Sequence, residues 1–110
     1  MDPIIQQIAA ELNKQPDHVE NVVRLLDEGN TIPFIARYRK ELHGAMDDTS
    51  LRTLEERLRY LRGLAERKEA VKSAIEEQGK LTAELSAAID TAATLAEVED
   101  LYRAYKQQRR

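Results

Sequence analysis

Apolar positions recur every three or four residues along almost the whole chain, and this spacing predicts helices rather than strands. A first short pattern follows Asp2, the predicted helix cap, and a second runs from Pro16 to the stop at Gly29. The positions expected to face inward are Ile4, Ile5, Ile8, Ala9, Leu12, Val19, Val22, Val23 and Leu26. Two short helices joined by a short turn are typical of a helix-turn-helix unit.

A third short helix is predicted over about residues 33–41, with Thr31 as its cap and Pro33 in its first turn. Three side chains are expected to face the core: Phe34, Ile35 and Tyr38. Three cations are expected to fan outward: Arg37, Arg39 and Lys40. Residues 42–46 then form a predicted connector, with Gly44 as its turn residue.

One very long helical pattern follows the connector. Residues 47–50 read Asp-Asp-Thr-Ser, and a helix cap is favoured over a metal loop because no further spaced ligands are present. Up to Gln78 only Gly63 interrupts the pattern, and Gly79 is expected to end the helix. The apolar positions are Leu51, Leu54, Leu58, Leu61, Leu64, Ala65, Val71, Ala74 and Ile75.

The length of this helix suggests that its apolar stripe needs other helices or a partner to cover it. Some 30 residues span roughly 45 Å, whereas a compact domain of this size is only about 34 Å across. The apolar stripe is therefore expected to be incompletely covered by the short helices and to need a partner, either another subunit or more of the same polypeptide. The other faces of the helix suggest charged pairs four residues apart, such as Lys72 with Glu76.

Two further helices are predicted near the end of the chain. Thr82 caps the first, and Thr94 opens the second in a capping box, with Glu97 reaching back to the amide of Thr94. The predicted fold class is thus all-α. A helix-turn-helix-like head covers residues 1–44, and residues 45–110 supply the long helix and a helical continuation that is incomplete at its C-terminus. The whole is expected to be part of an elongated helical scaffold.

The charge pattern narrows the candidate functional residues. The net charge is −3 over 110 residues, so any contact with nucleic acid has to be a local patch. The second helix is predominantly acidic, which favours a structural role for the helix-turn-helix-like unit over phosphate binding. Two basic groups remain as candidate nucleic-acid contacts: Arg37, Arg39 and Lys40, followed by Lys106, Arg109 and Arg110. The first group could equally pair with neighbouring acids or favour its helix C-terminus.

Several function classes find no support. Without cysteine there is no disulfide or thiolate metal site, and no run of 18 apolar residues suggests a membrane span. His18 and His43 are too far apart for a zinc pair, and no glycine-rich phosphate loop or nucleophile elbow occurs. Tyr60, Tyr102 and Tyr105 are interpreted as core or interface anchors. We therefore expect no enzyme, no cofactor and no metal, and a cytoplasmic location.

Four sequence blocks closely resemble the N-terminal region of the Tex family of bacterial transcription accessory proteins. They are TIPFIARYRKE at residues 31–41, LEERLRYL at 54–61, IEEQGKLT at 75–82 and EDLY at 99–102. The resemblance covers essentially the whole chain and implies a fragment of a longer, largely helical protein. Where the family commonly has Tyr-Lys-Pro-Lys-Arg-Arg, this chain has YKQQRR at 105–110. His43 also stands where threonine is common, in a loop where little is expected to depend on it.

The resemblance implies a non-catalytic helical scaffold segment that supports the binding of RNA or DNA and transcription. In such proteins nucleic acid is bound chiefly by an S1 domain that this chain lacks. The implied partners are nucleic acid, the remaining domains of the same chain and the transcription machinery, with no membrane contact. The alternative, suggested by the long helix, is a module for protein interaction or self-association.

Overall fold

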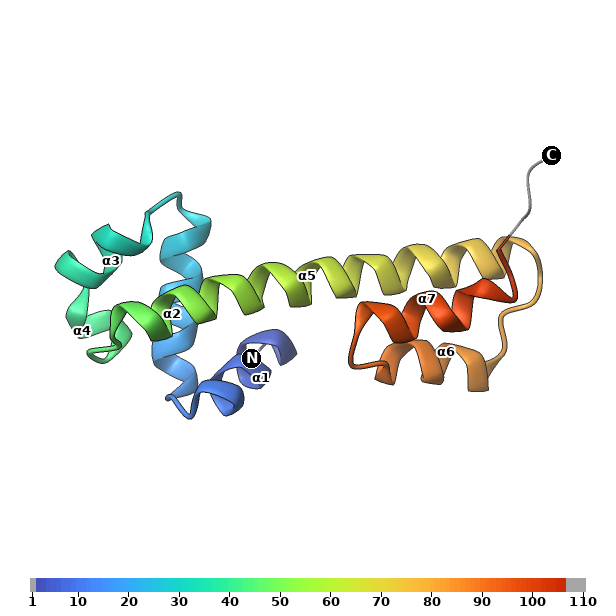
Figure 1. Ribbon diagram of the computed structural model, residues 1–110, viewed down its shortest axis with the longest axis horizontal. Coiled ribbons are helices and arrows are strands. Elements are labelled where there is room, and N and C mark those ends of the chain that lie inside the picture. Colours follow the sequence, from blue (N-terminus) through green and yellow to red (C-terminus); the bar gives the residue numbers. More distant parts are fainter. Residues whose placement is uncertain (1, 107–110) are drawn as a thin grey trace. The chain divides into compact units, whose positions relative to one another are not determined.

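The structure is a computed structural model that describes residues 2–106 of the chain. Within these residues it contains helices and no strand, which confirms the all-α prediction (Figure 1). The helices are α1 (Pro3–Leu12), α2 (Pro16–Asp27), α3 (Ile32–Tyr38), α4 (Lys40–His43), α5 (Asp48–Glu77), α6 (Ala83–Thr91) and α7 (Leu95–Arg103).

The chain divides into two compact units, Met1–Arg62 and Gly63–Arg110, and α5 contributes to both. The predicted domain boundary between residues 44 and 45 stays a prediction. Unit 1 holds α1 to α4 and the first half of α5. Unit 2 holds the second half of α5 with α6 and α7.

Helix α1 begins, and α2 ends, where the capping residues predict. The carboxylate of Asp2 accepts a hydrogen bond from the amide of Ile4 at 2.8 Å. Gly29 follows α2 with a φ of 96°, a left-handed conformation that favours glycine. In α2 the fully inward leucine is Leu25, whereas the expected Leu26 is only half-buried.

The prediction of one helix over residues 33–41 is wrong, because the chain breaks at Arg39 into α3 and α4 (Figure 1). Arg39 has φ −127° and ψ 37°, outside the α-helical region. The expectation that Phe34 and Tyr38 face the core is also wrong. The core face of α3 consists of Ile32 and Ile35, and at about 100° per residue the two aromatic rings then point to another side of the helix.

His43 is buried and not part of a loop, so the expectation that little depends on it is wrong. Its side chain is 1% exposed at the end of α4. Its Nδ1 accepts a hydrogen bond from the amide of Met46 at 2.9 Å, while Nε2 has no hydrogen-bond partner among residues 2–106. The ring thereby ties α4 to the segment that leads into α5, and Gly44 makes the predicted turn with a φ of 65°.

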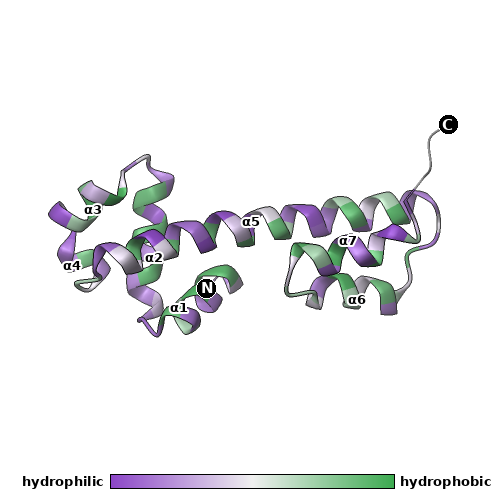
Figure 2. Cartoon of the chain, in the orientation of Figure 1, coloured by the Kyte–Doolittle hydropathy of each residue, from purple (hydrophilic) through white to green (hydrophobic). Residues whose placement is uncertain are grey.

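The large side chains of the apolar stripe of α5 are covered, contrary to the predicted shortage of cover, although Ala65 is exposed and Ala74 is half-buried. Figure 2 shows hydrophobic and hydrophilic segments alternating along this helix. Every member of the stripe with a large side chain is at most 5% exposed: Leu51, Leu54, Leu58, Leu61, Leu64, Val71 and Ile75. The cap at Asp47 is confirmed, since its carboxylate accepts from the amide of Ser50 at 2.8 Å.

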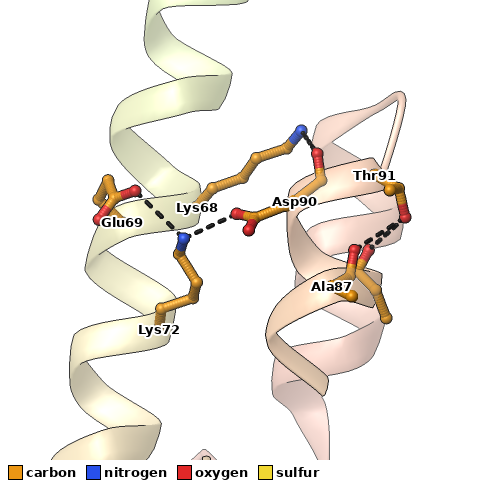
Figure 3. A network of polar contacts seen from close by, with 7 residues as sticks. Lys68, Glu69, Lys72, Ala87, Asp90 and Thr91 are labelled. Atoms are coloured by element: carbon orange, nitrogen blue, oxygen red, sulfur yellow. Dashed lines mark hydrogen bonds and ion pairs between the residues drawn. The ribbon is translucent and has the colours of Figure 1, made fainter. Parts of the chain in front are cut away.

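In unit 2 polar contacts join the second half of α5 to α6. Figure 3 shows the ammonium group of Lys72 between the carboxylates of Glu69 and Asp90, at 3.2 and 2.7 Å. Lys72 thus pairs with these two acids instead of the predicted Glu76. Lys68 donates to the backbone carbonyl of Asp90 at 2.8 Å, so two lysines of α5 hold the end of α6.

The predicted caps of α6 and α7 are confirmed. The hydroxyl of Thr82 accepts from the amide of Leu85, and that of Thr94 accepts from the amide of Glu97. One detail differs, because the Glu97 carboxylate accepts from the amide of Ala93 at 2.9 Å and not from that of Thr94.

Candidate nucleic-acid interface

The outward side of α3 carries two exposed aromatic rings. Phe34 is 36% exposed and Tyr38 is 57% exposed. The ring centroids lie 5.2 Å apart, and the ring planes are inclined at 45° to each other. These residues are four positions apart, so they stand one above the other along the helix. Together they form an exposed aromatic surface in unit 1.

Two of the three cations predicted as the leading candidates lie beside these rings. The guanidinium carbon of Arg37 lies 5.9 Å from the centre of the Tyr38 ring, and that of Arg39 lies 5.6 Å from the centre of the Phe34 ring. Both distances permit a cation–π interaction. Lys40 follows at the start of α4 and is exposed. We call Phe34, Arg37, Tyr38, Arg39 and Lys40 the α3 cluster.

The cations of the α3 cluster are not neutralised within residues 2–106. No carboxylate in this part of the chain forms an ion pair with them. The suggestion that they pair with the neighbouring acidic helices therefore finds no support. Their positive charge remains available to a ligand from outside.

Three arginines of α5, by contrast, each bind a carboxylate of another helix. Arg57 binds both carboxylate oxygens of Glu11 at 2.7 and 2.9 Å, and Arg62 binds those of Asp27 at 2.8 and 3.0 Å. Arg67 holds Glu99 in the same two-pronged way. We call these the α5 clamps, because each joins α5 to a neighbouring helix: α1, α2 and α7.

The clamps also shift the acidity of their carboxylates. The hydrogen bond from Arg67 lowers the pKa of Glu99 below its ordinary value of 4.5. Those from Arg57 and Arg62 lower the pKa of Glu11 and of Asp27 in the same way. These arginines serve the fold and are not free to bind phosphate.

Hydrogen bonds of one threonine and two asparagine side chains hold α3, α4 and the turn before them in place. The hydroxyl of Thr31 accepts from the amide of Phe34 at 3.3 Å and caps α3. The Asn30 side chain donates to the carbonyl of Leu25 at 2.8 Å and closes the turn after α2. The Asn21 side chain donates to the carbonyl of Leu42 at 3.1 Å and fastens α4 to α2.

The second predicted group of cations is only partly described. Lys106 is exposed, and its charge helps to lower the pKa of Glu99 after the larger effect of Arg67. Arg109 and Arg110 lie outside the described residues. Lys106 belongs to unit 2, so only Arg37, Arg39 and Lys40 are brought together in one unit.

A groove on α2 is unsuited to phosphate. Four of its eight lining residues are acidic, and its two arginines each pair with one of those acids. The lining residues are Asp2, Ile5, Glu20, Val23, Arg24, Asp27, Glu28 and Arg62. This supports the structural interpretation of the helix-turn-helix-like unit, because such a surface repels a polyanion.

Other kinds of site find no support in the part of the chain that the structure describes. No three side chains of His, Cys, Asp or Glu are grouped as a metal ion requires. No helix there is both long and apolar enough to cross a lipid bilayer. The α3 cluster is the candidate that remains.

The aromatic members of the α3 cluster were missed by sequence reasoning. Phe34 and Tyr38 follow the helical spacing of core residues, and the break at Arg39 is not marked by glycine or proline. One clue was present in the sequence. Each ring has an arginine next to it or within five positions, which is unusual for residues of an apolar core.

Comparison with known proteins agrees with the resemblance stated above. The family model described as Tex-like protein N-terminal domain matches residues 2–76. Protein YhgF of Escherichia coli (strain K12) is 55% identical over 109 residues, or 99% of this chain and 14% of that protein. Transcriptional accessory protein Tex of Neisseria gonorrhoeae is 50% identical over 107 residues, or 97% of this chain and 14% of that protein.

A more distant similarity extends to a human protein. S1 RNA-binding domain-containing protein 1 of Homo sapiens is 35% identical over 103 residues, or 94% of this chain and 10% of that protein. The chain spans about one seventh of the length of its bacterial relatives, since it covers 14% of them.

Proposed function

The chain belongs to the family of Tex-like protein N-terminal domains, and on that premise we propose that it is a non-catalytic helical scaffold segment of a transcription accessory factor. Its proposed task is to support the binding of nucleic acid by the larger protein, with a weak contact of its own. The remaining domains of the same polypeptide are its first partners, in the cytoplasm, and the transcription machinery is a further one.

The observation that carries this proposal is the contrast between the two sets of arginines in unit 1. Arg57 and Arg62 are each held by both oxygens of a carboxylate, whereas Arg37 and Arg39 lie beside exposed rings without a carboxylate partner in the described chain. Cations that are exposed and not neutralised are those that can replace the counterions of a phosphate backbone.

The contact is proposed to be weak because few cations take part. Arg37, Arg39 and Lys40 are opposed by Glu41 and by a net charge of −3. Lys106, Arg109 and Arg110 are proposed to add a secondary contact. The name of the human relative, S1 RNA-binding domain-containing protein 1, supports RNA as one ligand of the larger proteins. Most of the affinity is assigned to domains other than this one.

A salt titration tests the proposal. Three phosphate contacts to a single strand predict that the logarithm of the binding constant falls with that of the salt concentration with a slope of about −2. A fourfold rise in salt should then weaken binding roughly 20-fold. The double variant Arg37→Gln/Arg39→Gln should bind much more weakly and show a slope nearer −0.7.

The chain offers a matched control for this variant. Like Arg37 and Arg39, Arg52 and Arg59 are exposed residues of unit 1 that form no ion pair within residues 2–106, but they lie on α5 and outside the α3 cluster. They therefore test whether binding requires the α3 cluster or only any unpaired arginine. The variant Arg52→Gln/Arg59→Gln changes the net charge by the same amount and should bind almost as well as the unaltered chain. Equal losses in the two variants, or tight binding that persists at moderate salt, would contradict the proposal.

The structure does not support the observation that suggested the alternative function, which is protein interaction or self-association through the long helix. Self-association through the long helix required an uncovered apolar stripe, and the large side chains of the α5 stripe are buried. Sedimentation across a concentration series checks this point, and we expect a monomer. A dimer that forms at moderate concentration would revive the alternative.

A further inference from the structure

We propose that Phe34 and Tyr38 are a platform on which unpaired nucleobases stack, while Arg37, Arg39 and Lys40 hold the phosphates that link them. This inference rests on the proposed function and narrows it, because it names single-stranded nucleic acid as the ligand of this segment. The observations that support it are the exposure of the rings, their geometry and the sign of the charges around them.

The rings are placed as a stacking surface requires. Phe34 and Tyr38 are 36% and 57% exposed, whereas the buried residues of α3 are the aliphatic Ile32 and Ile35. Their planes are inclined at 45°, so the two rings are not stacked flat on each other. Planar aromatic side chains on a surface bind bases of any sequence through their π faces.

The charges around the rings favour an anionic ligand. Arg37 and Arg39 lie within 6 Å of the ring centres, at 5.9 and 5.6 Å. In residues 31–44 these arginines and Lys40 face a single acid, Glu41. A polynucleotide supplies both the flat rings and the negative charge that match this surface.

The neighbouring helix favours a single strand over a duplex. A duplex hides the faces of its bases, so only unpaired bases can stack on protein side chains. A duplex docked by the helix-turn-helix geometry would also approach α2 and the residue that follows it, where Asp17 and Glu28 are exposed acids. A flexible single strand can reach α3 without crossing that surface.

Three labelled probes test the inference: the two single strands carry equal charge, and the duplex of matched length carries about twice as much. They are an oligothymidylate of about 12 nucleotides, a strand of the same length without bases, and a duplex of matched length. Binding is measured by fluorescence anisotropy at low salt. The unaltered chain should bind the thymidine strand roughly fivefold or more tightly than the base-free strand and the duplex, because stacking adds to the phosphate contacts.

Two variants locate the effect. Phe34→Leu/Tyr38→Leu keeps apolar side chains at exposed positions but removes both π faces. It should lose roughly fivefold or more in affinity for the thymidine strand and bind the base-free strand unchanged. Tyr60→Leu is the control, because Tyr60 is also exposed, at 38%, and has an arginine over its ring at 5.3 Å. That arginine, Arg57, is neutralised by Glu11, so this variant should bind as the unaltered chain does.

The outcomes separate the inference from the proposed function. If the unaltered chain binds all three probes equally, the contact is to phosphate alone, and the inference falls while the proposed function stands. If it binds none of them, the proposed function falls and the inference with it. If the chain self-associates in sedimentation and the leucine variant does not, the rings form a protein contact and the inference is overturned.

Discussion

Replacing Gly44 by alanine should destabilise unit 1 for two separable reasons. Gly44 has a φ of 65°, where residues with a Cβ are strained. A Cβ at this position would also lie 2.2 Å from Nδ1, 2.5 Å from Cε1 and 2.8 Å from Cγ of His18. Contacts this short require the imidazole ring or the backbone to move. The turn between α4 and α5 therefore depends on a glycine both for its conformation and for its space.

The two contributions can be given separate magnitudes. A left-handed residue other than glycine costs about 1–2 kcal/mol. Forcing extra atoms into a packed site costs a further 1–3 kcal/mol or so. Gly44→Ala should thus lower the free energy of unfolding by about 2–5 kcal/mol. Gly29→Ala is the matched control, since Gly29 has a φ of 96° but no atom within 4 Å of its added Cβ. It should lose only the backbone contribution, about 1–2 kcal/mol.

A second background isolates the contact with His18. In a His18→Ala chain the added methyl group of Gly44→Ala meets no imidazole, so the substitution should cost about as much as Gly29→Ala does. The measurement is urea unfolding followed by circular dichroism, with free energies compared at equal m-values. Gly29 and Gly44 both belong to unit 1, so the comparison does not mix the unfolding of the two units.

Two results would refute this reasoning. The first is a Gly44→Ala variant that is no less stable than Gly29→Ala, which would show that the ring of His18 yields without cost. The second is a cost of Gly44→Ala that stays the same after His18 is removed. The additional destabilisation of Gly44→Ala over Gly29→Ala would then come from the backbone, and the contact with His18 would contribute nothing to it.

Two further predictions concern α5. Gly63→Ala should raise the free energy of unfolding by about 0.5–1 kcal/mol, because Gly63 lies within the helix and no atom lies within 4 Å of its added Cβ. Thermal unfolding measures this change. Gly79→Ala is the control, and it should lower the free energy of unfolding because Gly79 has a φ of 70°. Acid should weaken the α5 clamps, because the pKa values of Glu11, Asp27 and Glu99 are lowered in the folded chain. Their stabilisation is complete above the ordinary values of 4.5 and 3.8 and is lost as the pH falls through the lower folded-state values. Urea midpoints measured between about pH 7 and pH 3 should decline less steeply after Arg57, Arg62 and Arg67 are replaced by glutamine, and an unchanged decline would count against this assignment.

The ends of the helices were predictable because they depend on local chemistry. Asp2, Thr31, Thr82 and Thr94 each cap the helix that the sequence predicts for them. A capping hydrogen bond joins residues two or three positions apart, so nothing distant has to be known. The stripe of α5 was predictable for a similar reason, since its period follows from the geometry of a single helix.

The break at Arg39 and the burial of His43 depend on tertiary contacts. Arg39 is not a residue type that usually ends a helix, such as glycine or proline. The position of α4 is fixed instead by the hydrogen bond that the Asn21 side chain donates to the carbonyl of Leu42. These two positions are 21 residues apart in the sequence, beyond any local pattern. His43 is buried because α4 turns inward at this point. The residues around His43 do not by themselves reveal which side of the turn is covered.

The candidate site shows why local pattern alone stops short of function. The chain has 17 lysines and arginines, and in the sequence the arginines of α5 look much like those of α3. Arg57, Arg62 and Arg67 differ only because folding brings each to a carboxylate on another helix, 46, 35 and 32 residues away. The cations that remain for a ligand are those that the fold leaves without such a partner. Arg37 and Arg39 can therefore be distinguished from the arginines of the α5 clamps only after the helices are packed. Replacing both by glutamine should weaken nucleic-acid binding far more than it lowers the free energy of unfolding.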